Sequence, residues 1–423
     1  MEQKFYPALS ETVYRHTLPN GLPVVVVRRP GFTKKLAYFM TDFGSIHTHF
    51  TLDGVNYTVP DGIAHYLEHK MFDMPDGEVT EKFAAMGAMV NAFTGYDMTA
   101  YYFSCTDHFD SCLELLLSFV STPYFTESSV EKERGIIGQE IGMNEDNPEN
   151  QIFEHLMNAM YQNHPVRNPI LGTRQSIAQI TPELLEKTHA AFYRPENMLL
   201  CVVGDVDPEQ VCAIAQKVLP AKTAVQVSTP DSWQEQMQCC EPFVRNHMEV
   251  AMPMFQLGFK GEPLTKGAEA VRREIIGDLA AEALFGESSP LYLQMYEQGI
   301  IDSAFGGGLE TIQGMTILTA SGDSDHPEQV RDAIIQEAQR ISKEGIPETD
   351  FLRMKRSALG RRIKDLDSFD STCFRICAYH FSDYAYFDFP GLYQQIRMED
   401  IQEFLQRVVT AQRCSLAVIY PKD

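Results

Sequence analysis

The segment His65-Tyr66-Leu67-Glu68-His69 constrains this chain more than any other part of its sequence. Apolar residues around it recur at helical spacing, and Asp61 precedes them as the expected N-cap. Side chains four positions apart lie on one face of a helix, so His65 and His69 can direct two imidazoles to one metal ion. Glu68 reaches the same face. The order of these residues is the reverse of the common zinc-protease signature, and it predicts a zinc site.

Such a site needs a third protein ligand and an open position for water. A helix predicted over residues 126–143 carries two glutamates, Glu133 and Glu140, that lie seven positions apart and therefore on one face. Ile136 and Ile137 lie nearby, so we expect this face to point inward, where a carboxylate needs a partner such as a metal ion. We expect the other glutamates of this region to face solvent: Glu127, Glu131 and Glu145.

Two short strands are predicted after the metal motif, over residues 90–94 and 99–105. The first contains Asn91-Ala92-Phe93-Thr94 and alternates as a half-buried edge strand does. An edge strand next to a protease metal can pair with the backbone of an extended peptide, so these four residues are candidate substrate-binding residues. A purely structural role for the strand is equally open at this point.

Composition narrows the class of protein. The chain has 423 residues with 44% hydrophobic and 22% charged residues, which is typical of a folded protein with more than one domain. Its formal net charge of -23 argues against nucleic-acid and anionic-membrane partners. Nine cysteines, an odd number, and the lack of a long apolar run lead us to expect a cytoplasmic protein without a membrane span.

The second part of the chain repeats the plan of the first. The helix starting at Thr126 can be laid over one predicted at residues 347–366, which pairs Glu133 with Met354 and Glu140 with Arg361. We expect residues 290–300 at the position of the metal helix. No histidine occurs between His247 and His326, so the second copy is expected to lack metal ligands. We therefore predict an α+β fold with a first domain (residues 1–222), a linker (223–246) and a second domain (247–423).

Gly306-Gly307-Gly308 does not indicate nucleotide binding, because no Lys-Ser/Thr pair follows it. A bulge or tight turn is expected there. His155 and His164 are expected to be packed or solvated, because neither has a partner at ligand spacing. The remaining predicted strands and helices cover residues 16–29, 36–43, 79–86, 107–120, 150–163, 181 onward, 199–203, 208–219, 255–259, 271–285, 315–320, 327–344 and 414–420.

Several segments together are similar to the M16 (pitrilysin/insulinase-type) peptidases, and among these to the bacterial YmfH-like members. They are Gly62 to His69, Asn91 to Thr94, Glu133 to Glu140, Pro195 to Met198 and Gly204 to Asp207. The resemblance covers nearly the whole chain. It implies two homologous halves, each a mainly antiparallel sheet covered by helices, and a zinc-dependent endopeptidase that encloses peptides or unfolded segments.

The resemblance also implies roles for individual residues. His65, His69 and Glu140 would hold Zn²⁺, and Glu68 would be the general base. Glu133 would contact one of the ligands without touching the ion. Glu133 is the alternative third ligand, because the interval between His69 and Glu140 is slightly shorter than is usual in the family.

The sequence departs from the family at one point. Catalytic members carry an Arg and a Tyr in the second half that bind substrate and stabilise the developing oxyanion. Here Tyr296 and Asp302 align with these positions, and an aspartate would repel an oxyanion. We therefore expect a second M16-like chain that supplies the Arg/Tyr pair, with a homodimer as the other arrangement. The alternative function is that of a non-catalytic scaffold or assembly subunit.

Overall fold

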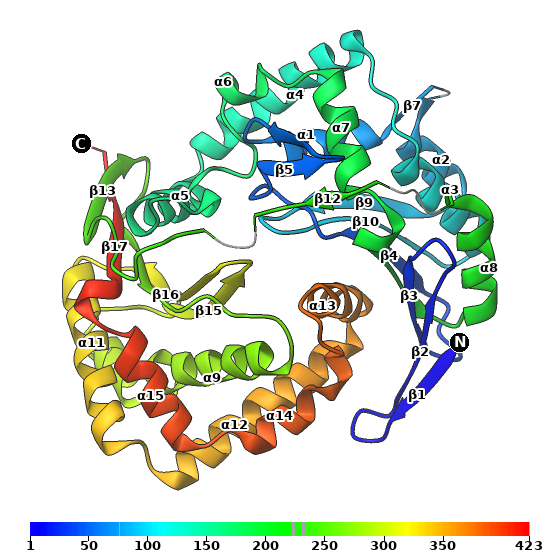
Figure 1. The fold of residues 1–423 in the computed structure, drawn as a ribbon. Coiled ribbons are helices and arrows are strands. Elements are labelled where there is room, and N and C mark those ends of the chain that lie inside the picture. The colour runs from blue at the N-terminus through cyan, green and yellow to red at the C-terminus, as the bar shows by residue number, and fades with distance from the viewer. Residues whose placement is uncertain (76, 222–224, 231–232, 423) are drawn as a thin grey trace.

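The computed structural model describes residues 1–75, 77–221, 225–230 and 233–422. The chain forms two halves, drawn from blue to green and from green to red in Figure 1, and each half is built on one mostly antiparallel sheet with helices packed against it. The predicted α+β fold with two similar halves is confirmed. No helix in the described part of the chain is both long and apolar enough to cross a membrane.

The first sheet has seven strands in the order β1-β2-β3-β11-β4-β10-β9. Neighbouring strands are antiparallel, except for β3 and β11, which run parallel. The strands are Glu2–Tyr6 (β1), Glu11–Thr17 (β2), Pro23–Arg28 (β3), Lys35–Thr41 (β4), Met89–Thr94 (β9), Thr99–Cys105 (β10) and Met198–Gly204 (β11). The strand β9 therefore lies at the edge of the sheet, as the sequence predicts.

The second sheet has the order β13-β17-β14-β16-β15, and its one parallel pair is β13 with β17. Its strands are Phe243–Met248 (β13), Met254–Lys260 (β14), Gly306–Ile312 (β15), Met315–Asp323 (β16) and Cys414–Pro421 (β17). This order matches β3-β11-β4-β10-β9 of the first sheet strand for strand, including the parallel pair. The duplication inferred from the sequence is therefore present in the topology.

The matching strands also identify the matching helices. Two helices, Ile63–Met71 (α1) and Val79–Ala85 (α2), lie between β4 and β9, and two, Ala268–Phe285 (α9) and Pro290–Glu297 (α10), lie between β14 and β15. The helix equivalent to the metal helix α1 is therefore α9. The prediction that residues 290–300 occupy this position is wrong, because α10 corresponds to α2.

The remaining elements complete the two halves. The helices are Phe109–Ser121 (α3), Glu127–Glu145 (α4), Pro148–Met160 (α5), Arg174–Ile177 (α6), Pro182–Phe192 (α7), Pro208–Val218 (α8), Pro327–Glu344 (α11), Glu348–Lys364 (α12), Phe369–Phe381 (α13), Phe389–Gln395 (α14) and Met398–Val408 (α15). Two small sheets are formed by His49–Leu52 (β5), Val55–Thr58 (β6) and Val227–Ser228 (β12), and by Asp73–Met74 (β7) and Gly77–Glu78 (β8).

The two halves exchange a helix. The helix α5 of the first half packs on β14 and β17 of the second sheet, and α13 of the second half packs on β4 and β11 of the first sheet (Figure 1). Leu156 and Met160 of α5 lie in one hydrophobic core, and Cys373 and Ile376 of α13 lie in another. Each half thus buries an apolar sheet face under a helix from the other half.

Two local predictions differ from the structure. Residues 306–308 form the start of β15 rather than a bulge or turn, and a side chain at Gly307 would overlap the carbonyl oxygen of Thr319 on the paired strand. Residues 243–246, expected at the end of a linker, are the first part of β13. We therefore propose that the second domain begins at Phe243, the first residue of β13.

We expect neither half to fold stably alone, because removing one exposes an apolar sheet face on the other. A chain divided after Thr229 should give two pieces that are insoluble or lack near-ultraviolet circular dichroism when expressed separately, and that co-purify as a folded pair when expressed together. A first piece that unfolds cooperatively by itself, near the melting temperature of the intact chain, would contradict the helix exchange as a source of stability.

Candidate metal centre

The metal helix α1 begins where the backbone requires a glycine. Gly62 precedes it with a φ of 91°, in the left-handed region, and a side chain at this position would overlap the carbonyl oxygen of Leu171. Asp61 is not the N-cap, contrary to the sequence prediction. Its carboxylate instead accepts a hydrogen bond from Asn168 Nδ2 at 3.1 Å, which ties the start of α1 to the loop before α6.

Burial holds α1 in place. Every residue of this helix except His69 is buried, and the hydroxyl of Tyr66 donates a hydrogen bond to the carbonyl oxygen of Val130 on α4. The N-terminus of α4 is fixed by a capping box in which Thr126 and Ser129 bond each other's backbone amides. The hydrogen bond from Tyr66 therefore joins the two helices that carry the candidate ligands. The sequence does not predict this hydrogen bond of Tyr66, because a single tyrosine on the apolar face of a helix is more often simply part of the core.

The side chains of His65, His69 and Glu140 converge. One ligand atom from each lies within 4.8 Å of the other two, and in the described part of the chain this is the one such group of three or more potential metal-ligating residues. The Nε2 atoms of His65 and His69 lie 3.5 and 3.6 Å from the Glu140 carboxylate oxygens. Ligand atoms about 2.0 Å from a tetrahedral zinc ion lie about 3.3 Å apart, so these distances leave room for an ion.

Glu133 lies behind one of these imidazoles. Its carboxylate is 2.9 Å from His69 Nδ1, the ring nitrogen that faces away from the other two residues. This is the usual position of a carboxylate that orients a metal-binding histidine. The expectation that the whole face turns inward is only partly right, because Ile137 is buried while Ile136 is 45% exposed.

The electrostatics of the group favour a cation. Burial opposes protonation of His69, but its hydrogen bond with Glu133 and the charges of Glu68, Glu133 and Glu140 raise its pKa overall above the ordinary value. The neighbouring His65 ring lowers the pKa of Glu140. Three carboxylates, those of Glu68, Glu133 and Glu140, surround the two imidazoles, and a divalent cation would balance this excess of acidic groups. The donor set and its charge therefore fit Zn²⁺.

Glu68 lies next to the candidate ligands without being one of them. Its side chain is buried, and this burial raises the pKa of its carboxyl group, against the effect of a hydrogen bond from Thr94. The hydroxyl of Thr94 donates to Glu68 Oε2 at 2.6 Å. From the sequence, Thr94 is expected to bind substrate only, because no sequence pattern links it to Glu68, 26 positions away.

The strand β9 lies at the edge of its sheet beside this group, and the Ala92 amide on it donates to Asn91 Oδ1 at 2.9 Å, a bond that a paired peptide would replace. It pairs with β10 and with no other strand in the described part of the chain, and α1 packs on it. Side chains alternate along it: Thr94 faces α1, whereas the ring of Phe93 lies 5.9 Å from the ring of Phe374 on α13. The backbone of residues 91–93 is therefore held between the two halves with one side open.

Among the residues that the structure describes, the second half has no comparable group. Where α1 meets α4 through imidazoles and Glu140, α9 meets α12 through ion pairs, Glu282 with Arg361 at 2.8 Å and Glu274 with Arg362 at 3.3 Å. Arg361 is also the residue that the sequence lays over Glu140. The duplicated scaffold thus brings together three candidate metal ligands in one copy and charge pairs in the other.

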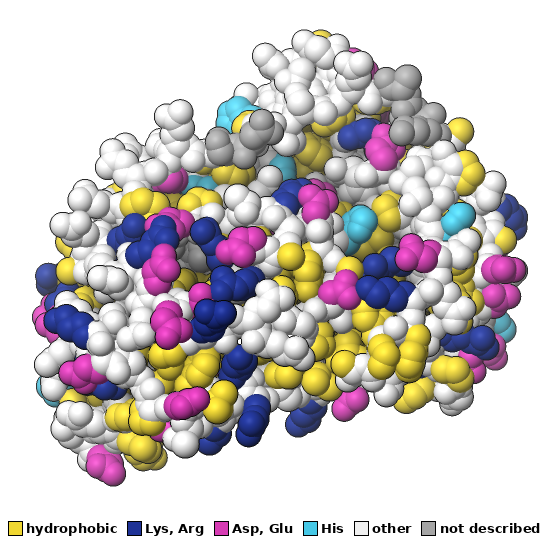
Figure 2. Space-filling view, turned by 60° about the horizontal axis from the view of Figure 1, so that its bottom comes forward, with side chains coloured by type: hydrophobic (Ala, Val, Ile, Leu, Met, Phe, Trp, Pro, Cys, Tyr) yellow, Lys and Arg dark blue, Asp and Glu magenta, His cyan; other side chains and the backbone are white. Residues whose placement is uncertain are grey.

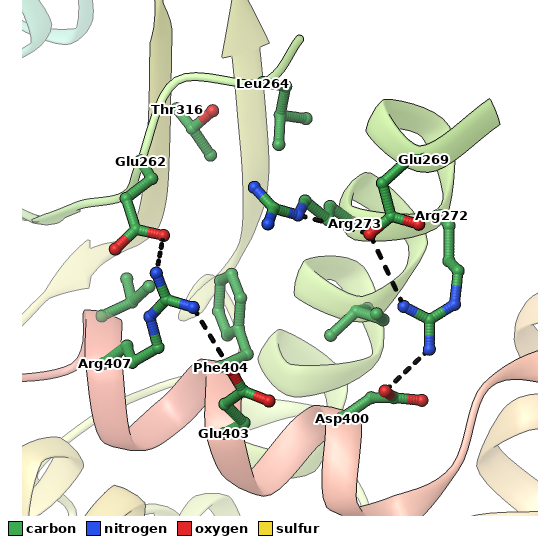
Figure 3. Close-up of a pocket in the computed structure, with 12 residues that line it drawn as sticks. Glu262, Leu264, Glu269, Arg272, Arg273, Thr316, Asp400, Glu403, Phe404 and Arg407 are labelled. Atoms are coloured by element: carbon green, nitrogen blue, oxygen red, sulfur yellow. Dashed lines mark hydrogen bonds and ion pairs between the residues drawn. The ribbon is translucent and has the colours of Figure 1, made fainter. Parts of the chain in front are cut away.

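A separate cavity of about 140 Å³ lies within the second half, between α9 and α15 (Figure 3). Three arginines face it, and each has a carboxylate partner: Arg272 with Asp400 and Glu269, Arg273 with Glu269, and Arg407 with Glu262 and Glu403. Figure 2 likewise shows basic and acidic side chains next to one another on this side of the molecule. The ion pair of Arg272 with Asp400 joins α9 to α15 beside this cavity, and the other pairs lie within one helix or link Arg407 to Glu262, so we assign the cavity no ligand.

Comparison with known proteins agrees with this picture. Residues 57–174 match the family described as Insulinase (Peptidase family M16), and residues 179–358 match the domain described as Peptidase M16 inactive domain. His65, His69 and Glu140 all lie in the first matched segment. The description of the second segment as inactive agrees with the charge pairs found in the second half.

Full-length relatives are also known. The chain is 38% identical over 99% of both sequences to a Bacillus subtilis protein named uncharacterized zinc protease YmfH. The structure of an M16-like peptidase from Alicyclobacillus acidocaldarius matches with a TM-score of 0.93 at 30% identity, over 98% of this chain and 99% of that one. A protease from Helicobacter pylori shares the fold, with a TM-score of 0.83 at 21% identity over 97% of this chain and 99% of that one.

The geometry predicts different effects for Glu133 and Glu140, which both lie on α4. Glu140→Gln should abolish stoichiometric zinc binding because it removes a ligand, whereas Glu133→Gln should weaken zinc affinity about 10- to 100-fold because the ligands remain. Metal analysis and titration with a competing chelator measure both effects, with Glu131→Gln on the same helix as the control. Loss of zinc from Glu133→Gln combined with full retention by Glu140→Gln would identify Glu133 as the ligand.

Proposed function

Because this chain belongs to the M16 peptidase family, we propose that it is a zinc-dependent endopeptidase that cleaves peptides or unfolded segments. The observation that carries the proposal is the convergence of His65, His69 and Glu140 around a space that fits one ion. The soluble character expected from the sequence leads us to propose a cytoplasmic location.

Each residue near the ion has a separate role in the proposal. His65, His69 and Glu140 would hold a zinc ion, and Glu133 would orient His69 through Nδ1. A bound zinc ion supplies Lewis acidity toward a water molecule and toward the scissile carbonyl group. Glu68 accepts a proton from the attacking water and delivers it to the leaving amine, which breaks the peptide bond. The raised pKa of Glu68, caused by burial, suits a group that must both take up and release a proton.

The open edge of β9 supports the proposed mode of substrate binding. A peptide that pairs with the backbone of Asn91, Ala92 and Phe93 would lie extended, directly beside α1. An extended backbone is accessible only in a peptide or an unfolded segment, because the interior strands of a folded protein are already paired. We therefore propose that folded proteins are not substrates.

A second chain completes the proposal. Tyr296 is half exposed on α10, and neither it nor Asp302 can supply the positive charge of the Arg that the family uses at the oxyanion. We propose that the Arg/Tyr pair comes from a second M16-like chain. A homodimer is the other arrangement, and it would lack the pair, because each copy carries Tyr296 and Asp302. The same missing pair is the one observation that favours a non-catalytic scaffold or assembly subunit.

Glu68→Gln tests the general base. The substitution preserves size and hydrogen bonding but removes the basic oxygen, so turnover should fall at least about 100-fold while zinc content stays stoichiometric. Peptide cleavage and metal analysis measure the two effects on the same sample, again with Glu131→Gln as the control. Cleavage by Glu68→Gln at the wild-type rate would refute the role of Glu68.

The requirement for a partner makes a further prediction. The isolated chain should cleave an unfolded peptide slowly or not at all, and addition of a second M16-like chain that carries the Arg/Tyr pair should raise the rate, because the oxyanion then gains its donors. Titration of one chain against the other should reach a plateau at equal amounts. Full activity of the isolated monomer would contradict the need for a partner.

A further inference from the structure

One hydrogen bond joins the proposed base to the proposed substrate strand. Thr94 is the last residue of β9, and its hydroxyl donates to Glu68 Oε2 at 2.6 Å. This is the one hydrogen bond to the Glu68 carboxylate within the described part of the chain. A hydroxyl that donates to a carboxylate over this distance forms a strong, charge-assisted bond.

We propose that Thr94 is a positioning residue for the general base: it binds one oxygen of Glu68, so that the other oxygen faces the water to be activated. This inference rests on the proposed peptidase function and changes the role expected for Thr94 from the sequence. Asn91, Ala92 and Phe93 remain the residues whose backbone can pair with a peptide. Thr94 instead links the strand that receives the substrate to the group that moves the proton.

The surroundings of Thr94 make it suitable for this role. Its backbone is paired with Thr99 on β10, and the next residue, Gly95, closes the hairpin through a bond from its amide to the carbonyl of Met98. The β-branched side chain has few rotamers, so a fixed backbone also fixes the hydroxyl. The carboxylate of Glu68 is therefore held between two rigid elements, the buried helix α1 and the hairpin β9–β10.

The bond also explains how one carboxylate can serve both as an anchored side chain and as a base. A carboxylate without a hydrogen-bond partner can take a broad range of angles about its last side-chain torsion. A donor on Oε2 selects one orientation and leaves the second oxygen free to accept a proton. Displacements of about 1 Å at a reacting group cost about 100-fold in rate, so this selection is expected to matter for turnover.

Thr99 offers a matched control. It lies directly opposite Thr94, and its buried hydroxyl donates to the carbonyl oxygen of Phe43 at 2.8 Å. Thr99→Val therefore removes a comparable hydrogen bond from the same level of the same hairpin without touching Glu68. Any loss of activity that comes from damage to the hairpin alone should appear in both variants.

Steady-state kinetics of the zinc-loaded protein, with its partner chain if one is required, tests the inference. Thr94→Val should lower kcat about 10- to 100-fold and leave KM and zinc content within about threefold of the wild type. Thr94→Ser keeps the hydroxyl and should recover most of the loss, and Thr99→Val should leave kcat nearly unchanged. A rise in KM with unchanged kcat in Thr94→Val would show instead that Thr94 contacts the substrate, and would overturn the inference.

Two measurements without turnover complete the test. Crystal structures of the zinc-loaded wild type and Thr94→Val should show the Glu68 carboxylate bound to Thr94 in the first and rotated or mobile in the second. Binding of an unfolded peptide to Glu68→Gln and to Glu68→Gln/Thr94→Val should have the same Kd. If the wild type cleaves no peptide even with a second M16-like chain that carries the Arg/Tyr pair, the peptidase function fails, and an unchanged Glu68 orientation in Thr94→Val would separately refute the role of Thr94.

Discussion

The contact between α1 and α4 determines what this molecule can do. Two imidazoles on one helix and a carboxylate on the other meet around a space that fits one ion, and their positions depend on the burial of α1 and its hydrogen bond through Tyr66 to α4. The residues around this contact each constrain one side chain. Gly62 sets the start of α1, Glu133 orients His69, and Thr94 holds one oxygen of Glu68. A metal site with a single open position needs this degree of preorganisation.

The duplicated halves show how one scaffold can carry two different chemistries. The sheet order and the parallel strand pair are the same in both, and so is the contact between the helices that follow β4 and β14 and the long helices α4 and α12. Only the side chains at that contact differ, with His65, His69 and Glu140 in one half and Glu282 with Arg361 in the other. Through the exchange of α5 and α13, the second half covers one face of the first sheet, so it has a structural role without candidate ligands of its own.

Sequence predicted most of the elements because their signals are local. The cap Thr126, the proline after Thr181 and the apolar runs of β3 and β11 mark helices and strands without reference to the rest of the chain. The errors concern relations between distant segments. Residues 290–300 contain α10, which precedes β15 as α2 precedes β9, and only the complete strand order shows that α9 is the counterpart of the metal helix. The bond from Thr94 to Glu68 depends on how β9 packs on α1, and no spacing in the sequence reports it.

The central claim is that His65, His69 and Glu140 bind one zinc ion. Anomalous diffraction from a crystal of the purified protein, recorded on both sides of the zinc absorption edge, tests it most directly. The account predicts a single strong peak about 2.0–2.2 Å from His65 Nε2, His69 Nε2 and a Glu140 oxygen. A peak bound elsewhere, or no peak in a zinc-saturated crystal with these three side chains turned apart, would contradict it.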